Sequence, residues 1–493
     1  MKTVFYYIFV ILFPVILLAG AEFFLRFAQT YTNQSQAFVQ SPNNQQYLQL
    51  NPDYIDNYFT GFNPAVGIYP FRKEKNSHTF RIVILGGSTT AGFPYQFDRS
   101  FSSLLEQKLQ RRNPATEVEV INLGITALNS FAIRDLGLKM LDHNPDLAII
   151  YGGHNEFYGS YGIASGIGGI PFANVRWIKN LSIALHQSHL YLALKDLLLP
   201  NGNEYEDKTL MAKALSNKTV AAESPERERA FQHFHANMID VLKEYTSRNI
   251  PVILSTVSSN LRDQAPLGSH DQAIDLFKKT DKSATNSPEE AFKTLTEARD
   301  LDPVPFRAPS QINAIIRNLA ERDRVWLVDS RTVFEEYFGS PTPGDSLFVD
   351  HLHFNPEGHE ILAGAFATEA LQIFSSREAF QSTSLHEMPK LPLDSLQLLK
   401  AEYRLMSLKN DAPFRSFHSS VERRRVKDSV RQVFANGSYL QQQALMYNNS
   451  TIGIEDLYRR QFGQKLAAGD TLNALSNLKS LLYYRQLREQ KSL

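Results

Sequence analysis

Short apolar runs recur along the middle of the chain, separated by longer stretches with helical periodicity. The runs with the length and composition of buried strands are 82–85, 118–123, 147–151, 251–257 and 325–328. Between them, apolar residues repeat at helical spacing, as at Phe101, Leu105 and Leu109. This alternation predicts a doubly wound parallel sheet in an α/β fold, with ligands at the carboxyl ends of the strands.

Two insertions and a C-terminal region depart from this alternation. The insertion at about 159–226 begins glycine-rich and contains an apolar helix, which predicts either a lid or a surface excursion. The insertion at about 264–309 contains Ser287-Pro288-Glu289-Glu290, a helix start with capping-box spacing. Its next residues resemble half a tetratricopeptide repeat, although a plain helical hairpin explains them more simply. Residues 376–493 are predicted to be helical and to cover the domain or bind a protein partner.

The N-terminus carries an uncharged apolar run from Val4 to Ala21, close to the length of a bilayer-spanning helix. Lys2 precedes the run, and after Arg26 no lysine or arginine occurs until Arg72, which places the rest of the chain outside the cytoplasm. We therefore predict a membrane anchor at 1–28, a polar tether and entry segment at 29–75, and the α/β domain with its insertions at 76–375. A cleaved signal peptide is the alternative, and it also exports the chain.

Composition narrows the possible functions. The 493 residues are 43% hydrophobic, which is enough for a substantial core. Lysine plus arginine and aspartate plus glutamate both number 51, so the net charge does not favour a nucleic-acid partner. The basic run 423–425 is interpreted as a solvated helix face. The sequence has no cysteine, which excludes disulfides, thiolate metal sites and cysteine nucleophiles.

Ser88 is the candidate nucleophile. It follows a buried strand and the pair Gly86-Gly87, whose small size permits a sharp turn and leaves backbone N–H groups accessible. Thr90 stands where an α/β-hydrolase elbow requires glycine, and no lysine forms a phosphate-binding loop, so both of those motifs are excluded. An ordinary strand-to-helix connection has the same appearance, so Ser88 needs a base from elsewhere in the chain.

Asp350-His351-Leu352-His353 can supply that base. A three-residue spacing lets Asp350 and His353 meet on one side of a tight turn, with one ring nitrogen bound to the carboxylate and the other facing Ser88. This predicts a Ser-Asp-His order in the chain. The alternative within the motif is His351 as a metal ligand beside Asp350 and His353.

A serine nucleophile also needs donors for the oxyanion that forms on attack. The ends of successive predicted strands offer the Ser88 backbone N–H, the Gly124 backbone N–H and the Asn155 side-chain amide. Each has a simpler explanation on its own, as a turn glycine or a helix cap. Their occurrence in this order along one sheet favours an oxyanion hole.

With these residues in place, the sequence resembles the SGNH or GDSL-type serine hydrolases over about 81–374. The resemblance lies in the blocks Gly86-Gly87-Ser88-Thr89, Gly124, Gly153-His154-Asn155-Glu156 and Asp350-His351-Leu352-His353. It implies a three-layer α/β/α sandwich with a five-stranded parallel sheet and activity on esters, with Ser88, Gly124, Asn155 and His353 as the named residues. Gly87 and Glu156 depart from the pattern, since the family usually has aspartate at both positions, which suggests a divergent branch.

The resulting expectation is an exported, membrane-anchored serine esterase or acyl hydrolase that needs no metal or cofactor. Its substrate is an ester or an acylated glycan, and Asn260, Arg262 and Arg307 are candidate substrate-binding residues, although Arg262 could simply pair with Asp263. One alternative is an O-acyltransferase or deacetylase acting on envelope polysaccharide. Another is a non-catalytic binding or scaffold protein with a relic triad.

Overall fold

The computed structural model describes the chain except at positions 1, 43, 60–62, 68, 96–98, 114–115, 168–173, 199–207, 216–217, 281–286, 376–394, 418, 449–453 and 492–493. The end of the glycine-rich stretch, part of the first insertion and the beginning of the predicted helical region at 376 therefore lie outside the described residues. All structural statements below concern the described part of the chain.

A five-stranded parallel sheet forms the centre of the molecule, in the order β5-β4-β6-β7-β8. Its strands are β4 (Thr79–Gly86), β5 (Glu117–Asn122), β6 (Leu147–Tyr151), β7 (Val252–Ser255) and β8 (Val325–Val328). Every residue of β4, β6 and β7 is buried, as expected for strands covered on both faces. The α/β fold and parallel sheet predicted from the apolar runs are confirmed.

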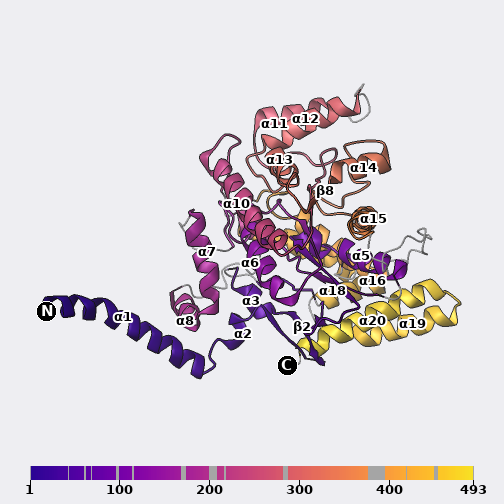
Figure 1. Cartoon of the computed structure of the whole chain (residues 1–493). Coiled ribbons are helices and arrows are strands. Elements are labelled where there is room, and N and C mark those ends of the chain that lie inside the picture. Colours follow the sequence, from indigo (N-terminus) through magenta and orange to yellow (C-terminus); the bar gives the residue numbers. More distant parts are fainter. Residues whose placement is uncertain are drawn as a thin grey trace.

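Helices cover both faces of this sheet (Figure 1). One layer contains α5 (Phe101–Arg112) and α15 (Pro356–Ile373), which pack against each other and are joined by an ion pair between Lys108 and Glu360. The other layer contains α6 (Ser130–Met140), α10 (Pro225–Ser247) and α13 (Ser310–Leu319). Alternate side chains of β4 point to the two layers, because their directions reverse at each residue of a strand. The result is an α/β/α sandwich.

The insertions are helical. The first contains α7 (Arg176–Ala184), α8 (His189–Leu198) and α9 (Leu210–Leu215), and the second contains α11 (Asp271–Lys279) and α12 (Pro288–Asp300). As predicted, α12 begins at Ser287, whose hydroxyl accepts from the backbone N–H of Glu290. Since α11 packs on α12, the structure agrees with a plain helical hairpin. Shorter elements are α4 (Ser88–Ala91), α14 (Ser330–Phe338), and the 3₁₀ turns Leu141–His143 and Leu185–Gln187.

The segment predicted to be a polar tether is folded onto the α/β domain. It forms α2 (Thr32–Ser35), α3 (Pro52–Asp56) and a small antiparallel sheet of β1 (Phe38–Ser41), β2 (Asn44–Leu50) and β3 (Phe71–Arg72). The hydroxyls of Tyr54 and Tyr58, both buried, donate to the Asp135 carboxylate on α6, at 2.5 and 2.6 Å. These two buried tyrosines attach the segment to α6.

The apolar N-terminal run lies in α1 (Lys2–Phe27), which projects from the domain in Figure 1. Its last turns are attached to the first insertion, because Glu22 accepts hydrogen bonds from the Ser188 hydroxyl and the backbone N–H of Leu190. Among the described residues, no helix has both the length and the hydropathy needed to cross a bilayer. The predicted anchor is therefore not supported.

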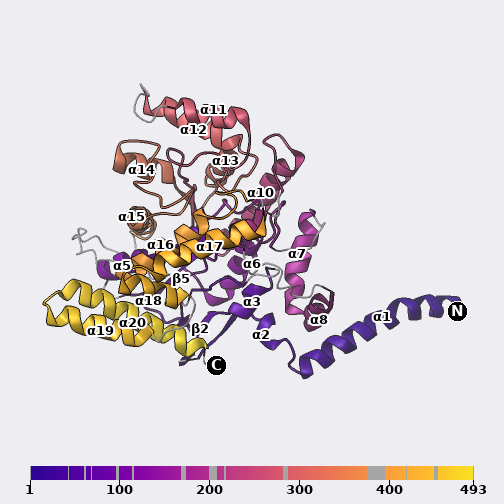
Figure 2. The same cartoon turned by 180° about the vertical axis from the view of Figure 1, so that it is seen from behind.

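The C-terminal region is helical, as predicted. It consists of α16 (Ser395–Lys409), α17 (Ser420–Ala435), α18 (Tyr439–Asn448), α19 (Ile454–Ala467) and α20 (Thr471–Lys491). These helices have a small core of their own, and Figure 2 shows them lying across the face of the α/β domain near α5, with α19 and α20 as a long hairpin. Polar contacts that join the parts include those from Arg404 to the Pro94 carbonyl, from Arg99 to the Ser476 hydroxyl and from the Thr209 backbone N–H to the Asp411 carboxylate.

Candidate active site

Ser88 is the first residue of α4, directly after β4 and two glycines. A Cβ atom at Gly86 would lie 2.1 Å from Thr90 Oγ1 and 2.2 Å from the Tyr151 carbonyl oxygen, so only glycine permits this turn to pack against β6. The N–H groups of a helix's first turn have no intrahelical partner. Ser88 therefore presents its hydroxyl and its backbone N–H at the carboxyl end of β4, between β5 and β6 in the sheet.

Asp350 and His353 lie in a tight turn just before α15. The backbone N–H of Val349 donates to the His353 carbonyl at 2.9 Å, which closes the turn. Inside it, Asp350 Oδ1 accepts from the backbone N–H groups of Leu352 and His353, both at 2.9 Å. The three-residue spacing thus holds the carboxylate and the imidazole on the same side, as the sequence predicted.

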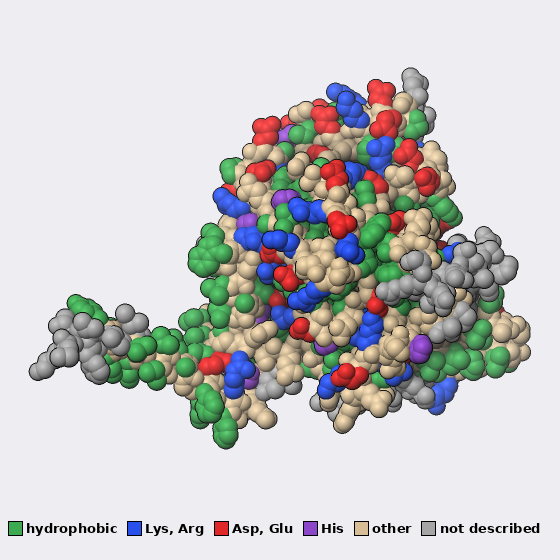
Figure 3. Space-filling model, in the orientation of Figure 1, with side chains coloured by type: hydrophobic (Ala, Val, Ile, Leu, Met, Phe, Trp, Pro, Cys, Tyr) green, Lys and Arg blue, Asp and Glu red, His purple; other side chains and the backbone are tan. Residues whose placement is uncertain are grey.

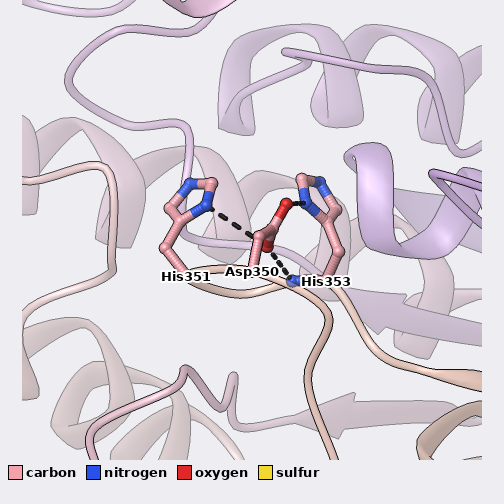
Figure 4. A group of neighbouring side chains, drawn as sticks. All are labelled: Asp350, His351 and His353. Atoms are coloured by element: carbon pink, nitrogen blue, oxygen red, sulfur yellow. Dashed lines mark hydrogen bonds and ion pairs between the residues drawn. The ribbon is translucent and has the colours of Figure 1, made fainter. Parts of the chain in front are cut away.

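The tertiary fold brings this turn to Ser88, although the residues are 265 positions apart. His353 Nδ1 lies 2.6 Å from Asp350 Oδ2, and Figure 4 shows the carboxylate between the rings of His351 and His353. A carboxylate only accepts, so Nδ1 carries the proton and Nε2 is the acceptor. The Ser88 hydroxyl, 2.7 Å from Nε2, donates to it. Ser88, Asp350 and His353 are all buried.

The electrostatics of the turn keep the carboxylate charged. Burial by itself would raise the pKa of Asp350, but His353 and His351 and their hydrogen bonds outweigh it and hold that pKa well below its ordinary value. His351 Nδ1 lies 3.3 Å from Asp350 Oδ1. Burial lowers the pKa of His351, against the opposing effect of Asp350. An anionic Asp350 beside a neutral His351 results.

Asp350, His351 and His353 are also close enough to share a cation, and they are the one such group among the described residues. In the arrangement found, however, Asp350 Oδ1 is bound by two backbone N–H groups and Oδ2 by the His353 ring. The remaining lone pair of His353 accepts from Ser88. The geometry is that of a hydrogen-bonded triad, and the metal-ligand alternative for His351 would require these bonds to break.

The three candidate oxyanion donors differ in availability. Asn155 Nδ2 donates one hydrogen to the Leu128 carbonyl at 2.8 Å, which leaves its second hydrogen free. The same nitrogen would lie 2.5 Å from a Cβ atom on Gly87, so the amide lies against the bare backbone beside Ser88. The backbone N–H of Gly124, in contrast, donates to Asn122 Oδ1 at 2.8 Å. In this structure the Gly124 donor is therefore already occupied.

Gly124 has a separate reason to be glycine. A Cβ atom there would lie 2.6 Å from the side chain of Thr90 and 2.7 Å from the backbone nitrogen of Ala91. The bare backbone therefore allows α4 to pack against the end of β5. Asn122 secures the same contact, because its Nδ2 donates to the Thr90 carbonyl at 2.8 Å. Sequence reasoning missed Asn122, which carries no motif signal of its own.

The predicted substrate-binding residues Asn260, Arg262 and Arg307 lie beside the catalytic turn, and the hydrogen bonds of Asn260 and Arg307 are made within the protein. Asn260 Nδ2 donates to Asp345 Oδ1 at 2.8 Å and to the Asp350 carbonyl at 3.2 Å. The buried Arg307 donates to the carbonyls of Asn260 and Gln264, at 2.9 and 2.7 Å. These bonds shape the loop that supports Asp350. Arg262 is exposed in the same loop, and its predicted role stays a prediction.

Two aromatic residues that sequence reasoning missed pack on the catalytic turn. The ring of Phe93 lies with its centroid 4.5 Å from that of His353. Phe414, which follows α16 in the C-terminal region, packs against His351 at 5.3 Å. Neither residue belongs to a motif, and a contact across such a sequence separation has no local signal.

Comparison with known proteins places this geometry in a family. A model of the GDSL-like lipase/acylhydrolase family matches residues 84–361, a range that includes Ser88, Asp350 and His353. No curated protein matches the chain.

Solved structures with similarity to the chain include the acetyl xylan esterase AlAXEase, at 16% identity over 59% of this chain and 99% of that one, with a TM-score of 0.30. Axe2, an acetylxylan esterase from Geobacillus stearothermophilus, is 16% identical over 60% of this chain and 94% of its own, with a TM-score of 0.31. A GDSL-family protein from Desulfitobacterium hafniense, described as a putative lipolytic protein, is 13% identical over 59% and 99%, with a TM-score of 0.28.

The family match covers more than half of the chain, begins at Ile84 within β4, contains β5, β6, β7 and β8, and ends within α15. It confirms the resemblance stated from the four sequence blocks. The chain belongs to the GDSL-like lipase/acylhydrolase family and is a serine hydrolase of the esterase type.

Proposed function

We propose that this protein cleaves carboxylic esters with Ser88 as nucleophile, His353 as general base and Asp350 as the group that orients His353. The observation that carries the proposal is the continuous chain of hydrogen bonds from Ser88 Oγ to His353 Nε2, at 2.7 Å, and from His353 Nδ1 to Asp350 Oδ2, at 2.6 Å. A serine hydroxyl is a weak nucleophile until a base takes its proton, and this geometry supplies the base in the required tautomer.

In the acylation step, Ser88 Oγ attacks the ester carbonyl carbon while its proton passes to His353 Nε2. The imidazolium that forms is stabilised by the ionised Asp350. The tetrahedral intermediate then collapses: the bond to the alcohol oxygen breaks, and His353 returns the proton to that leaving alcohol. In deacylation, water loses a proton to His353 as it attacks the acyl-enzyme, which releases the carboxylic acid and restores Ser88.

The charge on the carbonyl oxygen requires fixed donors. We assign this role to the Ser88 backbone N–H and the free hydrogen of the Asn155 amide, which lies against Gly87. Gly124 is the third candidate, and its N–H must first leave Asn122 Oδ1. Asn155 is the one side-chain donor of the three candidates, so we expect its replacement to lower kcat.

Transfer of the acyl group to a sugar hydroxyl instead of water uses the same acyl-enzyme, so O-acyl transfer is the second candidate. Ser88 and His353 are only 8% and 6% exposed. Such burial restricts the access of water to the acyl-enzyme, and this favours acyl transfer over hydrolysis. Partition of a pre-formed acyl-enzyme between water and an added glycan distinguishes the two reactions.

We also propose that the catalytic domain works outside the cytoplasm. The support is the charge pattern of the N-terminus, with Lys2 before the apolar run and no lysine or arginine between Arg26 and Arg72. A fusion of alkaline phosphatase after residue 75 should be active in a bacterial host, and removal of residues 2–27 should abolish that activity. An active phosphatase in the truncated fusion would contradict export by this segment.

A fluorophosphonate probe tests the central proposal. It should label the wild-type protein, and Ser88→Ala should abolish the label. Thr89→Ala is the matched control, because Thr89 is the next residue of α4, is buried, and has a hydroxyl without a hydrogen-bond partner. Labelling that persists in Ser88→Ala, or that is absent from the wild type, would refute the serine mechanism and favour a non-catalytic binding protein.

A further inference from the structure

A cavity of about 470 Å³ lies at the carboxyl ends of β7 and β8, enclosed by α12, α13 and α14. None of the proposed triad or oxyanion residues lines it. Its volume falls within the range of roughly 300–1,000 Å³ that small-molecule sites occupy. The ends of parallel strands are also where ligands bind in open α/β sheets.

Two hydroxyl groups on the cavity wall lack hydrogen-bond partners. Ser259 is 7% exposed, lines the cavity, and its Oγ bonds to no protein atom. Thr296 Oγ1, on the facing helix α12, is likewise buried and unpartnered. Leaving a buried hydroxyl unpaired is unfavourable, and rotation of either side chain toward the cavity would let a ligand that both donates and accepts hydrogen bonds satisfy it.

The charges around the cavity are balanced. Each arginine of the lining has a carboxylate partner: Arg299 bonds to Asp300 at 2.8 Å, Arg317 to Asp329 at 2.7 Å, and Arg331 to Glu289. Figure 3 shows the same mixture of acidic and basic side chains over the upper part of the molecule, where α11, α12 and α14 lie. A site for an anion would carry excess positive charge, whereas paired guanidinium and carboxylate groups offer adjacent donors and acceptors to a neutral diol.

The lining also contains apolar side chains. Phe292 lines the cavity with the Arg331 guanidinium stacked on its ring, at 4.0 Å from the centroid. Phe334, Pro341 and Pro343 add to this apolar lining. Sugars combine hydroxyl groups with hydrocarbon surface, so a lining that mixes apolar and hydrogen-bonding side chains complements them.

We propose that this cavity binds a neutral sugar, of one or two rings, as a second site separate from Ser88. The loop that forms its floor also supports the catalytic turn. Ser259 and Leu261 face the cavity, while the backbone N–H of the intervening Asn260 donates to the His351 carbonyl at 3.0 Å. The sugar site thus lies one loop away from Asp350, and sugar binding does not depend on Ser88 being catalytic.

Saturation-transfer NMR and calorimetry on the full chain test the proposal, with xylose, glucose and N-acetylglucosamine as probes and with glucuronate and inorganic phosphate as charged comparisons. At least one neutral sugar should bind, and Thr296→Val should weaken it about tenfold. Thr294→Val is the matched control on the same helix, because the Thr294 hydroxyl donates to the Glu290 carbonyl and does not line the cavity. Ser88→Ala should bind as the wild type does.

Ser259→Ala separates a ligand-binding role from a structural one. Removal of an unpartnered buried hydroxyl should leave the melting temperature unchanged or raise it, yet sugar affinity should fall. The proposal is overturned if no neutral sugar binds, if only the anions bind, or if Thr296→Val and Ser259→Ala bind as the wild type does. Loss of sugar binding in Ser88→Ala would also overturn it, because the sugar would then occupy the catalytic site.

Discussion

Arg404 of the C-terminal helices donates a hydrogen bond to the carbonyl oxygen of Pro94, at 2.9 Å. That carbonyl belongs to the turn after α4, which also carries Phe93, the residue packed on the His353 ring. The helical region outside the family match therefore contacts the wall of the catalytic site. The region predicted to cover the domain or to bind a partner thus contacts the turn whose Phe93 packs on His353.

This contact predicts that Arg404→Ala lowers kcat by roughly 10-fold with a smaller change in KM, because small displacements of catalytic groups are costly while substrate contacts remain. Steady-state kinetics on a short-chain aryl ester measure the split. Arg425→Ala, an exposed change on α17, should leave both constants unchanged. Equal kinetics for wild type and Arg404→Ala would show that the turn keeps its position without the C-terminal helices.

Asp350→Asn should reduce kcat by on the order of 10³–10⁴, because the amide cannot stabilise the imidazolium or hold the productive tautomer. The pKa of Asp350 is held well below its ordinary value of 3.8, so its contribution to stability is present above that value and is lost as pH falls below it. Thermal unfolding between pH 2 and 5 should show a steeper acid loss for the wild type than for Asp350→Asn. Parallel acid profiles for the two proteins would contradict the lowered pKa.

Gly87→Ala should lower kcat by roughly 10²–10³, comparable to the loss of an oxyanion donor, because the added Cβ would lie 2.5 Å from Asn155 Nδ2. The effect should depend on Asn155. In an Asn155→Ala background, the substitution at 87 should cost little more, since the atom it displaces is already gone. Additive losses in the double variant would instead indicate damage to the turn itself.

The buried carboxyl group of Glu156 gives a prediction about the pH dependence of stability. Burial raises its pKa from 4.5 to about 7, although hydrogen bonds from Ser130 act in the opposite direction. A raised carboxyl pKa means that the folded state binds more protons between these values, so stability falls as pH rises from 4.5 to 7.

Glu156→Gln removes this titration, and its stability relative to the wild type should therefore increase by roughly 3 kcal/mol across that interval. Urea unfolding at several pH values measures the difference, and comparison with the wild type cancels the titration of the buried histidines. A relative stability that stays constant with pH would exclude a raised pKa at Glu156.

Local sequence patterns were sufficient to predict the parallel sheet and the residues of the candidate triad. Strands buried on both faces appear as continuous apolar runs, so the sheet could be predicted from hydrophobicity alone. Asp350 and His353 could be paired because a three-residue spacing within one turn fixes their separation. Ser88 could be singled out because its strand ends in two glycines.

Other features depended on contacts between distant segments. The Asn-, Gln- and Ser-rich composition of residues 29–49 suggested a tether, but this stretch contains α2, β1 and most of β2. In the entry segment that follows, Tyr54 and Tyr58 find a buried acceptor in Asp135, which no local pattern indicates. Arg307 looked available for substrate, yet the fold surrounds its guanidinium with backbone carbonyls.

The sequence by itself determined which residues could form a nucleophile, a base and an orienting carboxylate, because those properties follow from residue type and short spacing. Only the tertiary structure decided that His353 Nε2 lies within hydrogen-bond distance of Ser88, that the Gly124 N–H is bound by Asn122, and that Phe414 packs on His351. Each of these depends on how elements far apart in the chain pack together, and packing is set by the whole core rather than by any one segment.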